Sequence, residues 1–275
     1  VQPDVICLQE VDVASTRTAL IDHVRWLLEH THLSYAAYAA QWKADFIPSN
    51  GLGRVNSGVT VLSRFPIESA YRASLPLIEE QDSLTQYFFL RRSALHVTLA
   101  LPEDRFPDVP QFGVLCAHTS AFTTQETKRA QYMWLRRWMD GFAQQGVPFV
   151  MGSDLNMVPP GATTRSGFDD VVQTDESFHS AYYEGQETWL SPFYEAYNPA
   201  VTLEEYARHE AKHLTHSMHK DYFWRRKLDY MFSNCTWASG SVKTLQDESS
   251  VGVETMSRSD HAPIVGTLSL GGEGQ

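Results

Sequence analysis

Short apolar segments that are each followed or preceded by an acidic residue, an asparagine or a histidine recur along the whole chain, among them VICLQ, FGVLCA, FVMGS and APIVGTL. Runs of this length, bounded by turn-forming residues, predict buried strands. The polar residues at or beside these segments are Glu10, His118, Asp154, Asn156, Asp229, Asp260 and His261. Because strand ends in layered α/β proteins meet at one edge, we expect these side chains to converge there.

Helical patterns lie between several of the predicted strands. Apolar residues recur at helical spacing over 17–30 and over 125–146, and Gly146 ends the second run. Further strands are expected at 57–63, in a β-rich run over 87–101, and at 112–117 after a proline-rich hairpin loop. This alternation predicts a mixed α/β sandwich rather than a doubly wound sheet, in one domain over residues 1–275. No apolar run is long enough for a membrane span, and no protein partner is implied.

The clustered carboxylates point to a bound cation. A single carboxylate at a strand end is usually a solvated turn residue, but several at one edge repel each other unless a divalent ion lies among them. Oxygen ligands suit hard cations, so the pattern predicts Mg²⁺ or Mn²⁺.

The charge balance limits the class of substrate. The chain has 22 Lys and Arg against 33 Asp and Glu, a net charge of −11. A broad basic face that grips nucleic acid is therefore not expected, because each neutralised phosphate needs a cation. A nuclease that uses a metal and a few arginines stays open, as do phospholipids and phosphorylated small molecules.

The order of the motifs resembles the endonuclease/exonuclease/phosphatase superfamily, which includes deoxyribonuclease I, abasic-site endonucleases, neutral sphingomyelinases and inositol-polyphosphate 5-phosphatases. The motifs span residues 4–270 and read LQE, NSGVTVLSRFPI, a strand ending in AH, KRAQ, GSDLN, KLDYMF and SDHAPI. The resemblance implies a deoxyribonuclease I-like, four-layer sandwich of two mixed β-sheets flanked by helices. It also implies a divalent-metal-dependent phosphoesterase that hydrolyses a phosphodiester or phosphomonoester by metal-assisted attack of water.

The resemblance also implies roles for the residues around the ion. Glu10 is similar to the family's metal ligand, and Asp260 to a second carboxylate near the ion. Asp154 resembles the residue that orients or deprotonates the attacking water. Asn156 would hydrogen-bond the phosphoryl oxygens.

Two histidines complete the set that the resemblance implies. His261 resembles the histidine that binds the scissile phosphate, and Asp229 the carboxylate that orients it. His118 matches the histidine near the leaving oxygen in deoxyribonuclease-like members. The family also has an asparagine-bearing strand before LQE, so we expect the natural chain to begin upstream of Val1.

Three arginines are candidates for binding the substrate phosphate. Arg91 and Arg92 are expected on one strand, where alternation points one of them inward. Arg226 lies in the basic run 225–227, just before KLDYMF. The alternative for that run is an ordinary solvated cluster.

Two rival functions stay open at this point. One is a binding protein that keeps the fold without activity, although the intact set of polar residues argues against it. The other is a zinc peptidase that uses His209, Glu210 and His213, which form an HExxH match extended by His219. Position 216 is histidine where the extended motif needs glycine to turn the chain.

Overall fold

The computed structural model describes residues 2–47, 52–79, 81–121, 123, 125–162, 188–217, 224–247, 252 and 254–270. The chain divides into two compact units, formed mainly by Gln2–Ser153 and by Asp154–Ser269. We describe each unit by itself. None of the helices among these residues is long and apolar enough to cross a membrane.

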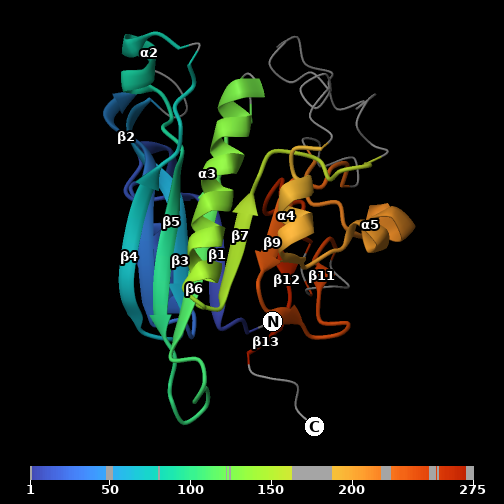
Figure 1. Ribbon diagram of the computed structural model, residues 1–275. Coiled ribbons are helices and arrows are strands. Elements are labelled where there is room, and N and C mark those ends of the chain that lie inside the picture. Colours follow the sequence, from blue (N-terminus) through green and yellow to red (C-terminus); the bar gives the residue numbers. More distant parts are fainter. Residues whose placement is uncertain are drawn as a thin grey trace. The chain divides into compact units, whose positions relative to one another are not determined.

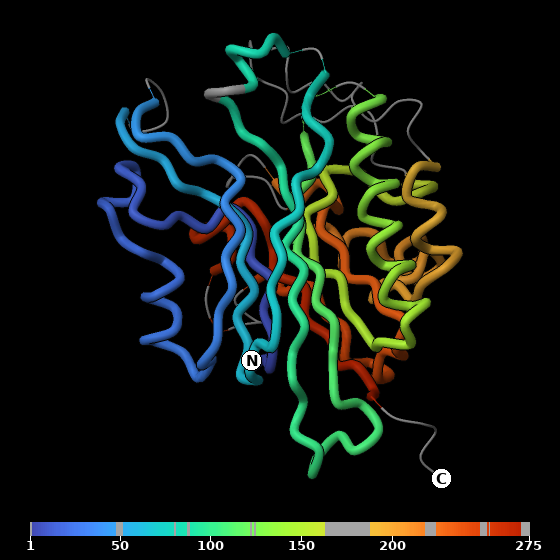
Figure 2. The backbone as a smooth tube through the Cα atoms, turned by 60° about the vertical axis from the view of Figure 1, so that its left-hand side comes forward, coloured from blue at the N-terminus to red at the C-terminus, as the bar shows by residue number. Residues whose placement is uncertain are grey.

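The N-terminal unit contains two sheets. Its elements are β1 (Val5–Asp12), a 3-10 turn η1 (Thr16–Thr18), α1 (His23–His30), β2 (Tyr35–Ile47), β3 (Gly53–Ser63), β4 (Ile67–Ser74), α2 (Ser83–Phe88), β5 (Ser93–Ala100), β6 (Gln111–His118), α3 (Gln125–Gln144) and β7 (Phe149–Asp154). One sheet has the order β1-β3-β2, with both pairings antiparallel. The other runs β4-β5-β6-β7, and its β5–β6 pair is the predicted hairpin (Figure 2).

The two sheets pack face to face, since β3 contacts both β5 and β6. Four valines of these strands have no exposed surface: Val59, Val61, Val97 and Val114. β-branched side chains fill such pleated surfaces well, which explains why these valine-rich segments form the central strands.

Helices cover the outer faces of the sheets. α1 contacts β1 and β2, and α3 runs along the other sheet (Figure 1). α3 lies so close to β6 that a Cβ atom on Gly113 would come within 2.4 Å of the Phe142 ring. The resulting helix–sheet–sheet–helix order confirms the predicted four-layer α/β fold.

Three predicted elements were wrong in extent. The strand expected at APIVGTL is divided into two short strands, Ile264–Val265 and Leu268–Ser269, which pair with different partners. The helix expected over 17–30 begins only at His23, because Ala19 and Leu20 adopt left-handed backbone angles of φ 53° and 61°. Asp22 then caps the helix by accepting a hydrogen bond from the Arg25 amide at 3.0 Å. The β-rich run over 87–101 becomes a strand only at Ser93, because its first residues end the short helix α2.

The C-terminal unit is built from short elements. They are α4 (Ser191–Ala196), β8 (Asn198–Pro199), α5 (Leu203–His209), a 3-10 turn η4 (Glu210–Lys212), β9 (Asp229–Ser233), β10 (Thr236–Trp237), β11 (Lys243–Thr244), β12 (Ile264–Val265) and β13 (Leu268–Ser269). The pairs β8–β9, β10–β13 and β11–β12 are antiparallel. Phe193, Trp224 and Phe232 are among the buried side chains of this unit.

Candidate active site

A histidine held by a carboxylate forms the centre of the site. His261 Nδ1 lies 2.8 Å from Oδ2 of Asp229, the first residue of β9. The other ring nitrogen, Nε2, lies 3.9 Å from Oδ2 of Asp154, where β7 ends. The structure therefore brings together three residues that come from separate segments of the sequence.

A strained turn fixes the Asp154 carboxylate. Asn156 has φ 48°, in the left-handed region that asparagine tolerates better than most residues. In this conformation its backbone amide donates to Asp154 Oδ1 at 2.8 Å, and its side-chain Nδ2 to Oδ2 at 3.2 Å. Asp154 is 3% exposed, so these bonds orient a carboxylate that is largely removed from water.

Charge keeps His261 protonated. Burial by itself would lower the pKa of His261, but the charge and hydrogen bond of Asp229, with the charges of Asp154 and Asp260, raise that pKa to about 10. At neutral pH the imidazole is thus a cation. A cation with one N–H directed at Asp229 has its other N–H available for an anion.

Buried polar residues support this centre from the segments before β9. Thr215 Oγ1 accepts hydrogen bonds from the amides of Leu228 and Asp229 at 3.0 and 3.2 Å. Lys227 Nζ donates to the Asp229 carbonyl at 2.8 Å and lies 4.7 Å from the Tyr230 ring centroid. Burial lowers the pKa of Lys227 to about 8, against the opposing effect of Asp229.

Within the N-terminal unit, two further predicted residues lie close to each other. Glu10 has φ 55° and lies where the β1–β3 register shifts, between Leu8 and Val11. Such a bulge re-aims a side chain, and the Glu10 carboxylate is 69% exposed, with Oε1 3.9 Å from Nδ1 of the buried His118. The structure thus brings Glu10, at the bulge inside β1, close to His118, the last residue of β6.

The donor atoms of the C-terminal unit fit a divalent cation. Asp154, Asp229 and His261 each offer a ligand atom within 4.8 Å of the others, and His216, Asp260 and His261 form a second such group. Carboxylates at this spacing are stabilised by a cation. The joint ligation of one ion by Glu10 and Asp260 remains a prediction.

Comparison with known proteins decides the family. The sequence model described as the endonuclease/exonuclease/phosphatase family matches residues 1–261. The chain belongs to this family. Its members are hydrolases that act on phosphate esters. A search of curated proteins found no match.

Several solved structures have the same fold as this chain. An endonuclease/exonuclease/phosphatase from Beutenbergia cavernae is 21% identical, with a TM-score of 0.63, and the match covers 98% of this chain but 63% of that one. The human nocturnin catalytic domain is 19% identical, with a TM-score of 0.51 and coverage of 97% and 82%. A mannosyl-6-phosphatase of Bacteroides thetaiotaomicron is 14% identical, with a TM-score of 0.55 and coverage of 97% and 85%.

The candidate arginines differ in their surroundings. Arg91 and Arg92 precede β5 instead of lying in it, so the predicted strand alternation does not apply to them. Arg91 Nε donates to the Gln86 carbonyl at 2.9 Å, and an Arg92 guanidinium nitrogen lies 3.3 Å from Gln41 Oε1.

The third candidate, Arg226, lies in the basic run 225–227. Arg226 is 5% exposed and Lys227 is 2% exposed, so the solvated-cluster alternative is wrong for both residues. Phosphate binding by the three arginines stays a prediction.

The zinc-peptidase motif is not formed as its chemistry requires. Helix α5 ends at His209, and Glu210 begins a 3-10 turn, so the two histidines of HExxH do not share one continuous helix. His213 Nε2 instead lies 3.8 Å from Glu205 Oε1. His219 lies outside the described residues. This geometry, in a family of phosphate-ester hydrolases, leaves the peptidase alternative without support.

One residue beside the centre, His216, was not predicted from the sequence. His216 entered only as a misfit in the zinc motif, yet its ring centroid lies 4.7 Å from that of His261. Burial, with the charges of His261 and Arg226, lowers the pKa of His216 to about 3, so the ring is neutral. The available signal was its place in a polar segment shortly before KLDYMF.

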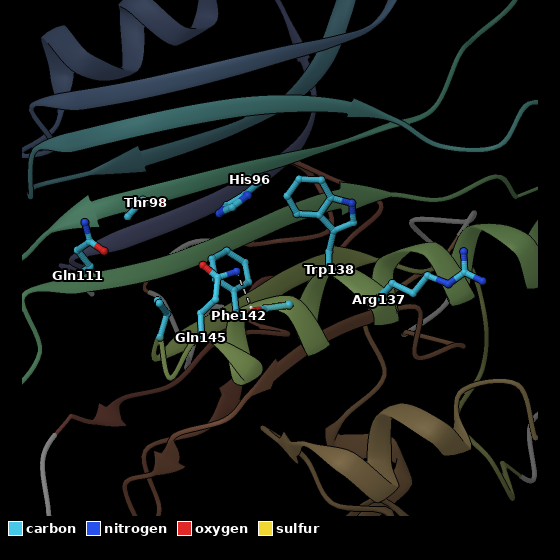
Figure 3. Close-up of a pocket in the computed structure, with 9 residues that line it drawn as sticks. His96, Thr98, Gln111, Arg137, Trp138, Phe142 and Gln145 are labelled. Carbon is cyan, nitrogen blue, oxygen red and sulfur yellow. Dashed lines mark hydrogen bonds between the residues drawn. The ribbon is translucent and has the colours of Figure 1, made fainter.

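A separate cavity lies between β5, β6 and α3 of the N-terminal unit (Figure 3). It encloses about 330 Å³ and is lined by His96, Trp138 and Phe142, with Arg137 at its edge. Burial lowers the pKa of His96, whose ring packs edge-on against Trp138 and Phe142. The described residues that line it include none of the predicted site residues.

Proposed function

We propose that this chain hydrolyses a phosphodiester or phosphomonoester by attack of water, with Mg²⁺ or Mn²⁺ as its cofactor. The observation that carries the proposal is the Asp229–His261–Asp154 arrangement, in which a protonated histidine and a largely buried carboxylate lie side by side. One offers a proton donor to a phosphoryl oxygen, and the other offers an acceptor to a water.

Asp154 is the residue we assign to the attacking water. Its carboxylate is held by two hydrogen bonds from Asn156, so one orientation is favoured before substrate binds. As the water oxygen bonds to phosphorus, Asp154 takes the water proton. The contact of Asn156 with a phosphoryl oxygen stays a prediction beside this positioning role.

His261 is the residue we assign to the phosphate. Its Nδ1–H goes to Asp229, which leaves Nε2–H for a non-bridging phosphoryl oxygen. A cationic donor gives the stronger, charge-assisted hydrogen bond. Asp229 therefore acts through His261, by fixing the ring and its charge.

The bond from phosphorus to the leaving oxygen breaks as the new bond forms, and the leaving oxygen needs a proton or a charge partner. We assign this to His118, beside Glu10 at the end of β6. Glu10 and Asp260 would hold the cation, which supplies stabilisation of charge on the phosphoryl group when bound.

A panel of candidate phosphate esters would test hydrolysis and identify the substrate class. Purified protein would be incubated with plasmid DNA, single-stranded RNA, sphingomyelin, an inositol polyphosphate and bis-p-nitrophenyl phosphate, each with Mg²⁺, with Mn²⁺ and with chelator. We expect hydrolysis of at least one member that chelator stops and metal restores. Absence of hydrolysis across the panel would contradict the proposal and favour a binding protein of the same fold.

A further inference from the structure

His216 is a buried imidazole with an unsatisfied nitrogen. The residue is 9% exposed, and its Nδ1 atom has no hydrogen-bond partner among the described residues. A buried polar atom without a partner is costly, and most such atoms in folded proteins are satisfied. A ligand that binds a ring nitrogen would remove that cost.

Backbone pairing places this ring beside two other possible metal ligands, Asp260 and His261. His216 forms bridge pairings with both Arg226 and His261, and the neighbouring Ser217 amide donates to the Asp260 carbonyl at 3.1 Å. The position of His216 against Asp260 and His261 is thus set by main-chain hydrogen bonds. These three side chains form what we call the His216 cluster.

The His216 cluster has the chemistry of a metal site. Each of its residues offers one ligand atom, and these atoms lie within 4.8 Å of one another. His261 Nδ1 is engaged by Asp229, which leaves Nε2 as its ligand atom. A histidine that binds metal through one nitrogen and a carboxylate through the other is the usual arrangement in metalloproteins.

We infer that His216, Asp260 and His261 bind a divalent transition-metal ion, with Zn²⁺ as the preferred species. Two imidazoles and one carboxylate suit zinc better than Mg²⁺, which prefers oxygen ligands. The inference goes beyond the proposed hydrolysis, which uses His261 as a proton donor to phosphate. Zinc would bind Nε2 only in place of its proton, which passes to solvent, and a metal-bound nitrogen cannot donate to phosphate. Zinc at this cluster would therefore inhibit the proposed hydrolysis.

The test measures zinc binding directly, so it does not depend on turnover. Zn²⁺ would be titrated calorimetrically into the full chain, and Co²⁺ would be added as a spectroscopic substitute whose visible absorption reports nitrogen ligation. We expect one site in the unaltered chain, weakened at least about tenfold by His216→Asn. Asp260→Asn, at an exposed position, should also weaken binding and is the variant less prone to misfold.

Two control variants make the assignment specific. His213→Asn removes another histidine with a buried, unpartnered Nδ1 that belongs to neither metal-competent group among the described residues, and should leave zinc affinity unchanged. Glu10→Gln should also retain it. The inference is overturned if the unaltered chain binds no zinc, or if folded His216→Asn binds it as tightly. It is equally overturned if Glu10→Gln, and not His216→Asn, abolishes binding. Failure of the hydrolysis panel would leave all these results intact.

Discussion

His261 Nδ1 lies 2.8 Å from Asp229 Oδ2, although 32 positions separate the two residues in the sequence. Asp229 begins β9, and His261 follows a turn that leads to β12. The pair links a rigid strand to a loop residue, which is how a scaffold commonly holds a reactive side chain. The charge of His261, and its orientation, depend on this carboxylate.

Replacing Asp229 with asparagine should therefore impair hydrolysis while preserving shape. We expect turnover to fall about 10- to 100-fold, because Asn keeps a hydrogen-bond acceptor but loses the charge. The pKa of His261 should fall from its raised value, as followed by NMR titration. Asp140→Asn, which alters a carboxylate paired with Arg136 on α3, is the matched control. Unchanged turnover together with an unchanged His261 titration would refute the positioning role.

The left-handed conformation of Asn156 separates backbone strain from side-chain function. Asn156→Gly and Asn156→Ala both remove the bond from Nδ2 to Asp154. Alanine is strained at positive φ and glycine is not, so Asn156→Ala should be less stable than Asn156→Gly by about 1 kcal/mol. Chemical denaturation measures this difference. Both variants should lose activity to a similar extent, and a fully active glycine variant would show that the side chain is dispensable.

His96 should make stability depend on pH. Burial lowers its pKa in the folded chain, so the unfolded chain binds more protons as the pH falls through the ordinary histidine range. The stabilising contribution is complete above about pH 6.5 and is lost below it. The unfolding free energy of the unaltered chain should thus fall more between pH 7.5 and 5.5 than that of His96→Gln. Replacement of the exposed His209 is the control, and equal slopes for His96→Gln and the unaltered chain would count against this reading.

Two glycines near the α3–β6 contact should respond in opposite ways to substitution by alanine, because only Gly113 faces the contact. Gly113→Ala would place a methyl group against the Phe142 ring and should destabilise the chain by about 1–3 kcal/mol. Gly141→Ala meets no atom within 4 Å and lies inside a helix, so it should stabilise by about 0.5–1 kcal/mol. Thermal unfolding of the two variants checks both signs. A neutral Gly113→Ala would mean that the helix can move away from the sheet.

Strand ends were the most predictable part of the site. β6 and β7 end at His118 and Asp154, as their apolar runs indicated, and Asp229 begins β9. These predictions succeeded because a buried strand must give way to polar residues at the sheet edge. The family resemblance supplied the roles, which periodicity cannot.

The features that escaped prediction depend on long-range contacts. The neutral state of His216 follows from burial by segments distant in sequence, and the bulge at Glu10 from its pairing with β3. The helix expected over 17–30 fails at Ala19 and Leu20, where the backbone takes left-handed angles and the amides bond back to Thr16 and Ser15. Apolar spacing carries no signal for these effects.

The proposed function is that of a metal-dependent phosphoesterase that uses Asp154 as its water-orienting carboxylate. The most direct test compares the unaltered chain with Asp154→Asn on the best substrate of the panel, before chelation, after it, and after Mg²⁺ is restored. Chelation should abolish hydrolysis by the unaltered chain, and Mg²⁺ should restore it. Folded Asp154→Asn should stay at least about 100-fold slower throughout. Metal-independent hydrolysis, or Asp154→Asn turnover equal to that of the unaltered chain, would contradict the proposed function.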